Sequence, residues 1–294
     1  DSPPLTGVGM INQYVTSMDN GSSWDSSSSL VLSNNLSVTS GNNVLVGVGT
    51  GGRITRSTDN GSSWDNVTSP TQLQIEGVTF GNNTFVAVGQ SGNIVRSTNN
   101  GASWDNATTD NSTTNLLRGV TFGNNTFVAV GISGNIVRST DNGSSFDNAT
   151  IDNSTANNLW EVTFGNNTFV AVGETGAIAR STDNGASWDN ATSPTPTNLF
   201  GVTFGNNIFV AVGSSGSIVR STDNGTSFDN VTSPTAMDLL DVEFGNNTFI
   251  AGGRDGNIIR STNNGASWDN VTSGLPTGLL GPPSREMRDI IFLK

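Results

Sequence analysis

The stretch Ser57-Thr58-Asp59-Asn60-Gly61-Ser62-Ser63-Trp64 recurs along the whole chain of 294 residues. Its copies begin 40 or 42 residues apart, and they occupy residues 17–24, 57–64, 97–104, 139–146, 181–188, 221–228 and 261–268. A fixed period of this length indicates one supersecondary unit that is stacked many times. The sequence therefore predicts a repeat protein whose fold follows from the structure of a single unit.

One complete unit contains four short segments that are rich in Val, Ile, Phe and Thr and are bounded by Gly and Asn. These segments are residues 77–80, 84–88, 93–97 and 102–107. Such a pattern is typical of strands joined by tight turns. A repeated four-stranded antiparallel unit of this length is a β-propeller blade. We therefore predict an all-β fold, a seven-bladed β-propeller of four-stranded antiparallel blades, with residues 1–294 forming a single domain.

The two ends of the sequence contribute to the same unit. Residues 5–9 align with the second strand of the unit, whereas residues 288–292 align with the first strand. We expect residues 288–292 to pair with residues 5–9 and to close the ring, because a closed ring leaves no open sheet edge. The linker over residues 273–286 is longer than its counterparts, so an exchange of this strand between molecules, which would produce a fibre, is the alternative.

Composition excludes several classes of function. The formal net charge of −12 argues against binding to nucleic acid or to an anionic membrane surface. The absence of Cys and His excludes disulfides, thiol catalysis and the usual zinc sites, and we expect no cofactor and no metal. No apolar run approaches the length of a membrane span. The chain begins with Asp1, which is compatible with the removal of a signal peptide.

The repeated octapeptide is interpreted as a framework element. Asp59 can accept N–H bonds across the turn, Gly61 supplies a positive φ, and Trp64 is expected to pack between blades. An arginine precedes six of the seven copies, as Arg56 does for its own. We expect each arginine to pair with the Asp that follows the octapeptide, such as Asp65, and an anion site is the alternative interpretation.

Asn-x-Ser/Thr sequons are placed regularly along the repeat and predict N-glycosylation. One set follows each aromatic-Asp pair: Asn66, Asn106, Asn148, Asn190, Asn230 and Asn270. A second set lies in the turn between the first two strands: Asn82, Asn124, Asn166 and Asn246. Asn and Thr are also common turn and edge residues. The alternative is therefore that the sequons arose by chance, were copied with the repeat and are not glycosylated.

The repeats diverge on one face of the predicted ring. Connections in an up-and-down blade alternate between its two ends, so the variable positions gather at one end. We predict a binding surface there, formed by Glu76, Arg118, Trp160, Glu161, Glu174, Phe200, Asp241, Arg254 and Arg288. Drift at unconstrained exposed positions is the alternative explanation. No catalytic residues are assigned, because no two carboxylates are paired by the sequence and Tyr14 is the only tyrosine.

The octapeptide resembles the Asp-box (BNR repeat) of sialidases, sortilin-type receptors, xyloglucan-cleaving propellers and photosystem-II assembly-factor-like propellers. The longer pattern Val88-Gly89-x-x-Gly92-x-Ile94-x-Arg96-Ser97 is most similar to the last group. The resemblance covers nearly the whole chain and implies a propeller, but these families share no single chemistry. Two copies depart from the pattern, since Asn99 and Asn263 replace the aspartate.

These observations favour a non-catalytic, secreted or cell-surface scaffold for adhesion or assembly that is N-glycosylated. Its expected partners are other copies of itself in a fibre, another surface protein, or a glycan. A carbohydrate-binding lectin or glycoside hydrolase that uses the variable face is one alternative. An assembly-factor-like propeller that binds protein inside the cell is the other.

Overall fold

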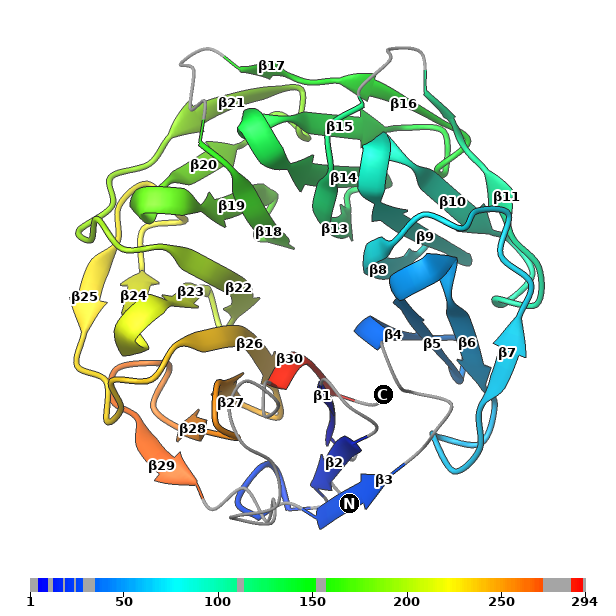
Figure 1. Ribbon diagram of the computed structural model, residues 1–294. Coiled ribbons are helices and arrows are strands. Elements are labelled where there is room, and N and C mark those ends of the chain that lie inside the picture. The colour runs from blue at the N-terminus through cyan, green and yellow to red at the C-terminus, as the bar shows by residue number, and fades with distance from the viewer. Residues whose placement is uncertain are drawn as a thin grey trace.

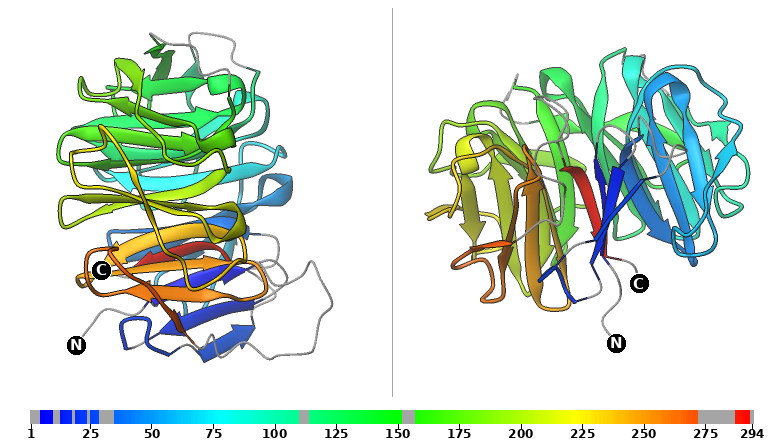
Figure 2. Two further views of the ribbon diagram at one scale, coloured as in Figure 1. Left: turned by 90° about the vertical axis from the view of Figure 1, so that its left-hand side faces the viewer. Right: turned by 60° about the horizontal axis from the view of Figure 1, so that its bottom comes forward.

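The computed structural model describes residues 5–9, 13–17, 19–23, 25–28, 35–109, 114–151, 157–271 and 287–292. Its strands surround a central axis as a ring of sheets (Figure 1), and the sheets pack face to face around that ring (Figure 2). Hydrogen bonds group the strands into seven sheets. The prediction of an all-β propeller with four-stranded antiparallel blades is confirmed.

The strand closest to the axis is the first of each repeat. These inner strands are β4 (Asn35–Gly41), β8 (Ile75–Gly81), β13 (Leu117–Gly123), β18 (Leu159–Gly165), β22 (Leu199–Gly205), β26 (Leu239–Gly245) and β30 (Met287–Phe292). The second strands are β1 (Leu5–Gly9), β5 (Val44–Gly49), β9 (Thr84–Gly89), β14 (Thr126–Gly131), β19 (Thr168–Gly173), β23 (Ile208–Gly213) and β27 (Thr248–Gly253). All these neighbours within a sheet are antiparallel, as expected for a meander.

The third and fourth strands complete each sheet toward the rim. The third strands are β2 (Gln13–Ser17), β6 (Ile54–Ser57), β10 (Ile94–Ser97), β15 (Ile136–Ser139), β20 (Ile178–Ser181), β24 (Ile218–Ser221) and β28 (Ile258–Ser261). The outer strands are β3 (Asp25–Ser28), β7 (Asp65–Val67), β11 (Asp105–Asn106), β16 (Ser145–Asn148), β21 (Ser187–Asn190), β25 (Asp229–Val231) and β29 (Asp269–Val271).

Two sheets contain a fifth short strand that the sequence did not predict. β12 (Thr108–Thr109) and β17 (Thr150–Ile151) lie in linkers and pair in parallel with β16 and β21 of the following sheet. Each therefore covers the outer edge of its neighbour, which protects an otherwise open row of backbone groups. The second and third strands are joined by 3-10 turns: η2 (Thr50–Gly52), η3 (Gln90–Gly92), η4 (Ile132–Gly134), η5 (Glu174–Gly176) and η6 (Ser214–Gly216).

The core lies between adjacent sheets. Every residue of β9 is buried, because neighbouring sheets cover both of its faces. One cluster combines Val46 of β5 with Phe85 of β9 and with Trp104 from the octapeptide, so it joins two sheets. Phe80 and Phe85 also contact each other, with ring centroids 4.6 Å apart. Burial of both faces explains why the second strand of each repeat is an uninterrupted apolar run.

The octapeptide forms a hydrogen-bonded turn between the third and outer strands. The Ser63 backbone N–H donates to Asp59 Oδ1 (2.8 Å), and the Ser63 hydroxyl donates to Oδ2 (2.6 Å). Gly61 has a φ of 87° and its N–H donates to the Ser57 hydroxyl (2.9 Å), while the indole N–H of Trp64 donates to the Gly61 carbonyl (3.1 Å). The predicted roles of Asp59 and Gly61 are confirmed, and Trp64 is buried.

The predicted partner of the arginine that precedes each octapeptide is wrong. Arg56 and Asp65 lie opposite each other on β6 and β7, but no ion pair between them is found in the described structure. The Arg56 Nε–H instead donates to the Asn100 carbonyl in the next sheet (2.7 Å). The same bond joins Arg180 to Asn224, Arg220 to Asn264 and Arg260 to Asn20. These arginines therefore connect adjacent sheets, because their long side chains extend to the octapeptide turn of the next sheet.

The strand from the end of the sequence pairs with the strand from its beginning. β30 runs antiparallel to β1 from Leu5 opposite Phe292 to Gly9 opposite Met287, with a bulge between Val8 and Gly9. β30 and the N-terminal strands form one sheet with the order β3-β2-β1-β30. The linker over residues 273–286 lies outside the described residues.

Candidate functional site

The variable residues of the repeats meet at one end of the central channel. A cavity of about 360 Å³ opens there, at the first residues of the inner strands. It is lined by Leu36, Ser37, Glu76, Gly77, Arg118, Trp160, Glu161, Phe200, Leu240, Asp241, Arg254 and Asp289. We call this cavity the mouth. Most of the predicted variable-face residues are therefore neighbours in space, although they come from different repeats.

Two of the predicted residues are not brought into the mouth by the described structure. Glu174 begins η5, where its backbone N–H donates to the Asn158 carbonyl (2.8 Å), and it does not line the cavity. Arg288 belongs to β30, but its side chain lies outside the described part of the chain. Seven of the nine predicted residues therefore line the mouth, whereas Glu174 does not, and a binding role for this surface stays a prediction.

One wall of the mouth is aromatic. Trp160 of β18 and Phe200 of β22 stack with ring centroids 4.8 Å apart and an interplanar angle of 28°. Both rings are half-buried, and Leu36 and Leu240 extend the apolar lining. Trp64, Trp104, Trp188 and Trp268, by contrast, are buried between sheets. A half-exposed aromatic pair at a cavity offers a flat apolar surface to a ligand.

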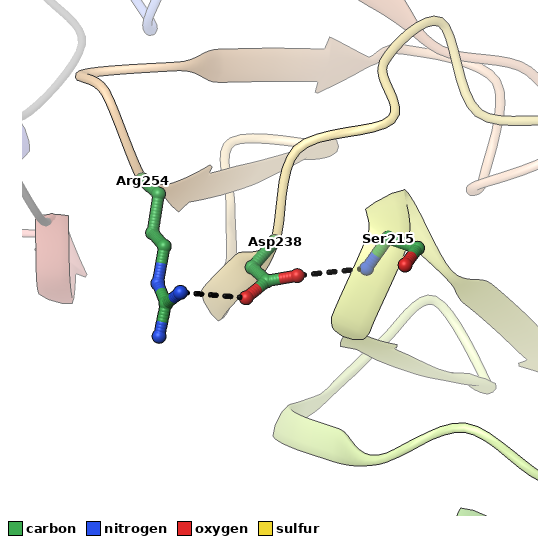
Figure 3. A network of polar contacts seen from close by, with 3 residues as sticks. All are labelled: Ser215, Asp238 and Arg254. Carbon is green, nitrogen blue, oxygen red and sulfur yellow. Dashed lines mark hydrogen bonds and ion pairs between the residues drawn. The ribbon is translucent and has the colours of Figure 1, made fainter.

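Two arginines add charge to the mouth. The Nε of Arg118 is buried and has no hydrogen-bond partner among the described residues. Arg254 pairs with Asp238 (3.3 Å), and the Ser215 backbone N–H donates to the other carboxylate oxygen of Asp238 (2.8 Å; Figure 3). The Arg254 side chain is 54% exposed, so this ion pair adds little stability and leaves the guanidinium accessible.

Behind the mouth, the channel continues as a narrower cavity of about 160 Å³ that is lined by the inner strands. Four of its lining side chains are carboxylates: Glu161, Asp241, Glu243 and Asp289. Burial raises the pKa of Glu161 to about 8, despite a hydrogen bond from the Val162 N–H. Burial, together with the charges of Asp289 and Glu243, raises the pKa of Asp241 well above its ordinary value.

The same channel also raises the pKa of Asp289. Burial raises the pKa of Asp289 to about 7, with smaller contributions in the same direction from the charges of Glu161 and Glu243. Each carboxylate that ionises makes ionisation of its neighbours less favourable, because their like charges are poorly screened in this space.

Among the described residues, no group of three or more side chains has an arrangement that could hold a metal ion. The described residues also include no helix long and apolar enough to cross a membrane.

Sequence reasoning missed Glu243, and it noted Asp289 on the variable face without including it in the predicted binding surface. Both are exceptions to the repeat. Glu243 occupies an inner strand position that is Thr79, Thr121 or Thr163 in other repeats, and Asp289 occupies one that is Gly77 or Gly119. A charged residue that replaces Thr or Gly at a channel position is informative only when the channel is known, because the sequence does not show which face of the strand is enclosed.

The predicted glycosylation sites lie in two different environments. The first set, at the outer strands, is exposed: Asn66, Asn106, Asn148, Asn190, Asn230 and Asn270. In the second set, the side-chain amide joins neighbouring repeats, as when Asn82 donates to Asn142 Oδ1 (3.2 Å). Asn124 and Asn166 make similar bonds to Asn167 and Asn224, and the backbone carbonyl of Asn246 accepts one from Asn20 (3.4 Å).

Comparison with known proteins is informative about the fold. No protein-family model matches the chain, and no curated protein matches it. Among solved structures it is similar to YCF48 from Cyanidioschyzon merolae, with 18% identity, a TM-score of 0.67, and coverage of 83% of this chain and 87% of that one. YCF48 bound to a D1 peptide is similar at 17% identity and a TM-score of 0.66, covering 92% and 88% of the two chains.

An ancestral GH74 enzyme is also similar, with 18% identity and a TM-score of 0.64. The match covers 80% of this chain but only 38% of the enzyme, so much of that enzyme has no counterpart here. At such identities the likeness establishes the fold and not a shared chemistry. The chain is thus a β-propeller whose structural neighbours include both a protein solved with a bound peptide and a GH74 enzyme.

Proposed function

We propose that the protein is a non-catalytic scaffold that binds a polypeptide partner at the mouth of its central channel. The observation that carries this proposal is the meeting of Trp160, Phe200 and Arg118 in one cavity. Symmetric repeats have no structural need for aromatic and cationic residues at these positions, since other repeats carry Leu or Glu there. Peptide binding by YCF48 supports a polypeptide as the partner class.

The mouth combines the features of a protein-binding site. The stacked rings present apolar area at little cost in side-chain entropy, because aromatic rings have few rotatable bonds. The unpartnered Nε of Arg118 provides a donor that a backbone carbonyl or an acidic side chain can satisfy. Arg254 remains accessible at the rim of the same cavity. Together the stacked rings and the two arginines favour, as ligand, an extended peptide segment in which an apolar side chain lies next to a hydrogen-bond acceptor.

A peptide display library provides the test. Peptides selected on the intact protein should lose at least about tenfold in affinity when Trp160→Ala or Phe200→Ala is introduced, because aromatic anchors dominate such interfaces. Met237→Ala is the matched control, since Met237 is an exposed apolar side chain (48%) that does not line the mouth. Selected peptides that bind both mouth variants as tightly as the parent would contradict the proposal.

Carbohydrate binding is the second candidate. The half-exposed Trp160–Phe200 pair could stack on a sugar ring, and Glu161, whose pKa is raised to about 8, has the protonation state of a general acid. A glycan array and an assay of polysaccharide cleavage test this candidate. Glycan binding that Trp160→Ala abolishes would replace the peptide proposal, and cleavage that Glu161→Gln abolishes would make the protein a glycoside hydrolase.

We also propose that the protein is displayed outside the cell and glycosylated at the outer strands. The exposure of Asn66 and its equivalents supports this assignment, because glycans there would cover the outer sheet edges. Peptide mass spectrometry of material from the native source should find these Asn modified. Unmodified peptides at all six outer sites would show that the sequons are only copied turn and edge residues.

The finer architecture belongs to the same proposal. We interpret the seven sheets as seven blades, the octapeptides as Asp-boxes, and β30 as the strand that closes the ring. The alternative, in which β30 completes a neighbouring molecule and builds a fibre, uses the same strand contacts. Electron microscopy of native material distinguishes the two, because single rings require β30 in its own ring whereas filaments require it to cross between molecules.

A further inference from the structure

The inner strands meet each other in two different ways around the channel. At three junctions the third residue of the inner strand is a glycine that abuts the next strand. A Cβ on Gly77 would lie 2.4 Å from the Arg118 carbonyl oxygen, and one on Gly119 or Gly201 would lie 2.8 Å from the Cα of Glu161 or Asp241. These strands therefore pack backbone against backbone and leave no room for a side chain.

The junctions on the two sides of β30 are bridged by carboxylates instead. The Ile290 N–H of β30 donates to Asp241 Oδ2 of β26 (2.7 Å). On its other side, the Val38 N–H of β4 donates to Asp289 Oδ2 of β30 (2.8 Å). Both acceptors occupy the position that is Gly77 or Gly119 in other repeats. β30 is thus held to both neighbouring inner strands by side chains, in addition to its pairing with β1.

We propose that Asp241 and Asp289 form a two-sided latch on β30 and that the latch is weakened as the pH rises. Each carboxyl oxygen accepts a backbone N–H whether the group is protonated or ionised, so two such bonds, one on each side, hold the strand to both neighbours. The strand has special need of this, because it pairs with a segment from the opposite end of the sequence. Closing so long a loop carries an entropic cost that local contacts must offset.

Ionisation of the carboxyl groups in the channel weakens the latch. The carboxylates that face Asp289 are Asp241 and Glu243 from β26 and Glu161 from β18, and Glu76, Arg118 and Arg254 line the mouth beside it. The described residues of β4, β1 and β27 contribute no ionisable side chain to the latch. Ionisation of these carboxylates at high pH therefore brings like charges together around β30 without a cation from the adjacent strands.

The direction of the pH effect follows from proton linkage. The pKa of Asp289 is raised to about 7 in the closed ring and returns toward its ordinary value when β30 separates. The closed state consequently binds more protons between about pH 4 and about pH 7, and it is favoured at the lower end of this range. Release of β30 becomes easier as the pH rises through about 7.

Hydrogen exchange of the full chain tests the latch. The probes are the amides of residues 287–292, and those of residues 84–89 in the buried strand β9 are the internal reference. In the parent protein, the protection of β30 relative to β9 should fall by about tenfold or more between about pH 5.5 and about pH 8.5. Asp241→Ala and Asp289→Ala should lower it at both pH values, because they remove the acceptors.

Asparagine variants distinguish the effect of the hydrogen bond from the effect of the carboxylate charge. Asp241→Asn and Asp289→Asn keep an acceptor oxygen but cannot ionise, so protection of β30 should be retained and should fall less steeply with rising pH than in the parent protein. Asp59→Asn is the matched control: it makes the same substitution at a carboxylate that accepts the Ser63 N–H (2.8 Å) in the turn between β6 and β7. Unchanged β30 protection in the alanine variants, or an unaltered pH dependence in the asparagine variants, would overturn the proposal.

Discussion

The octapeptide turns and the central channel use the same residue type in opposite ways. In the turns, hydrogen bonds from the hydroxyl and backbone N–H of Ser63, and from the Ser57 hydroxyl, lower the pKa of the exposed Asp59 to about 2. In the channel, burial raises the pKa of Asp289 to about 7 and that of Glu161 to about 8. The turns surround each carboxylate with donors, whereas the channel gathers carboxylates with few donors and with each other.

This difference shows how a repeat protein can keep its repeated structural residues apart from the residues that vary between repeats. An aspartate that returns in nearly every repeat sits in a complete set of local bonds, so each copy can be satisfied by its own turn. Three of the channel carboxylates, Glu161, Asp241 and Asp289, share a position that is Gly in three other repeats, and Glu243 replaces a Thr. They depend on neighbouring sheets for their environment. A departure from the repeat is therefore a better indication of a special site in this molecule than a residue that is repeated.

The largest expected effect distinguishes the tryptophans of the two regions. Trp188 is buried between sheets (1% exposed) in a cluster with Phe169 and Val128, so Trp188→Ala should lower the free energy of unfolding by about 3–5 kcal/mol. Trp160→Ala at the mouth should cost about 1 kcal/mol, because the ring is only half-buried. Urea unfolding measures both changes. Equal losses would mean that the mouth aromatics are part of the core and not free for a ligand.

The second prediction uses pH to distinguish the two sets of carboxylates. Raised pKa values in the channel mean that the folded state binds more protons than the unfolded chain between about pH 4.5 and about pH 8, so stability should fall as the pH rises through this range. Lowered pKa values at Asp59 and at Asp141 mean that stability should also fall below about pH 4, as the turns take up protons on unfolding. Stability should therefore be greatest near pH 5, as thermal unfolding across this range can show.

Glu161→Gln sharpens this second prediction. The variant removes one ionisable group from the channel, so it should raise the free energy of unfolding at about pH 8 by about 1–2 kcal/mol and have little effect at about pH 5. The side chain is half-buried and water can enter the channel, which keeps the gain below the full value of the pKa shift. A variant that is destabilised equally at both pH values would show that the carboxylate is needed for packing and not merely tolerated.

The smallest effect concerns the turns alone. Asp59→Ala removes the acceptor of both Ser63 bonds and should lower the free energy of unfolding, by less than Trp188→Ala does. Asp59→Asn should cost less stability than Asp59→Ala, because Asn99 already makes the same turn. The Oδ1 of Asn99 accepts from the Ser103 N–H (3.0 Å), and its amide donates to the Ser103 hydroxyl (2.8 Å). Chemical denaturation at neutral pH measures both. A large loss in the asparagine variant would show that the negative charge itself is required.

The sequence by itself determined the repeated unit, its strands and turns, and the face on which the repeats diverge. Local chemistry is sufficient for these features, because Gly, Asn and Asp define each turn and the apolar runs define each strand. It did not determine that Arg56 bonds to the next sheet instead of to Asp65, or that the linkers add β12 and β17 to the following sheets. These contacts join residues far apart in the sequence.

Only the tertiary structure decided the site. The ring brings Arg118, Trp160 and Phe200 from separate repeats to one cavity, and it encloses Glu161, Asp241, Glu243 and Asp289 in one channel. Glu161, Asp241 and Asp289 share one position of the repeat, and Arg118, Trp160 and Phe200 share the position before it, but the repeat alone does not show that these positions face a common channel. Their shared environment exists because the inner strands surround a common axis, so burial and mutual charge, which set their chemistry, are properties of the assembled ring.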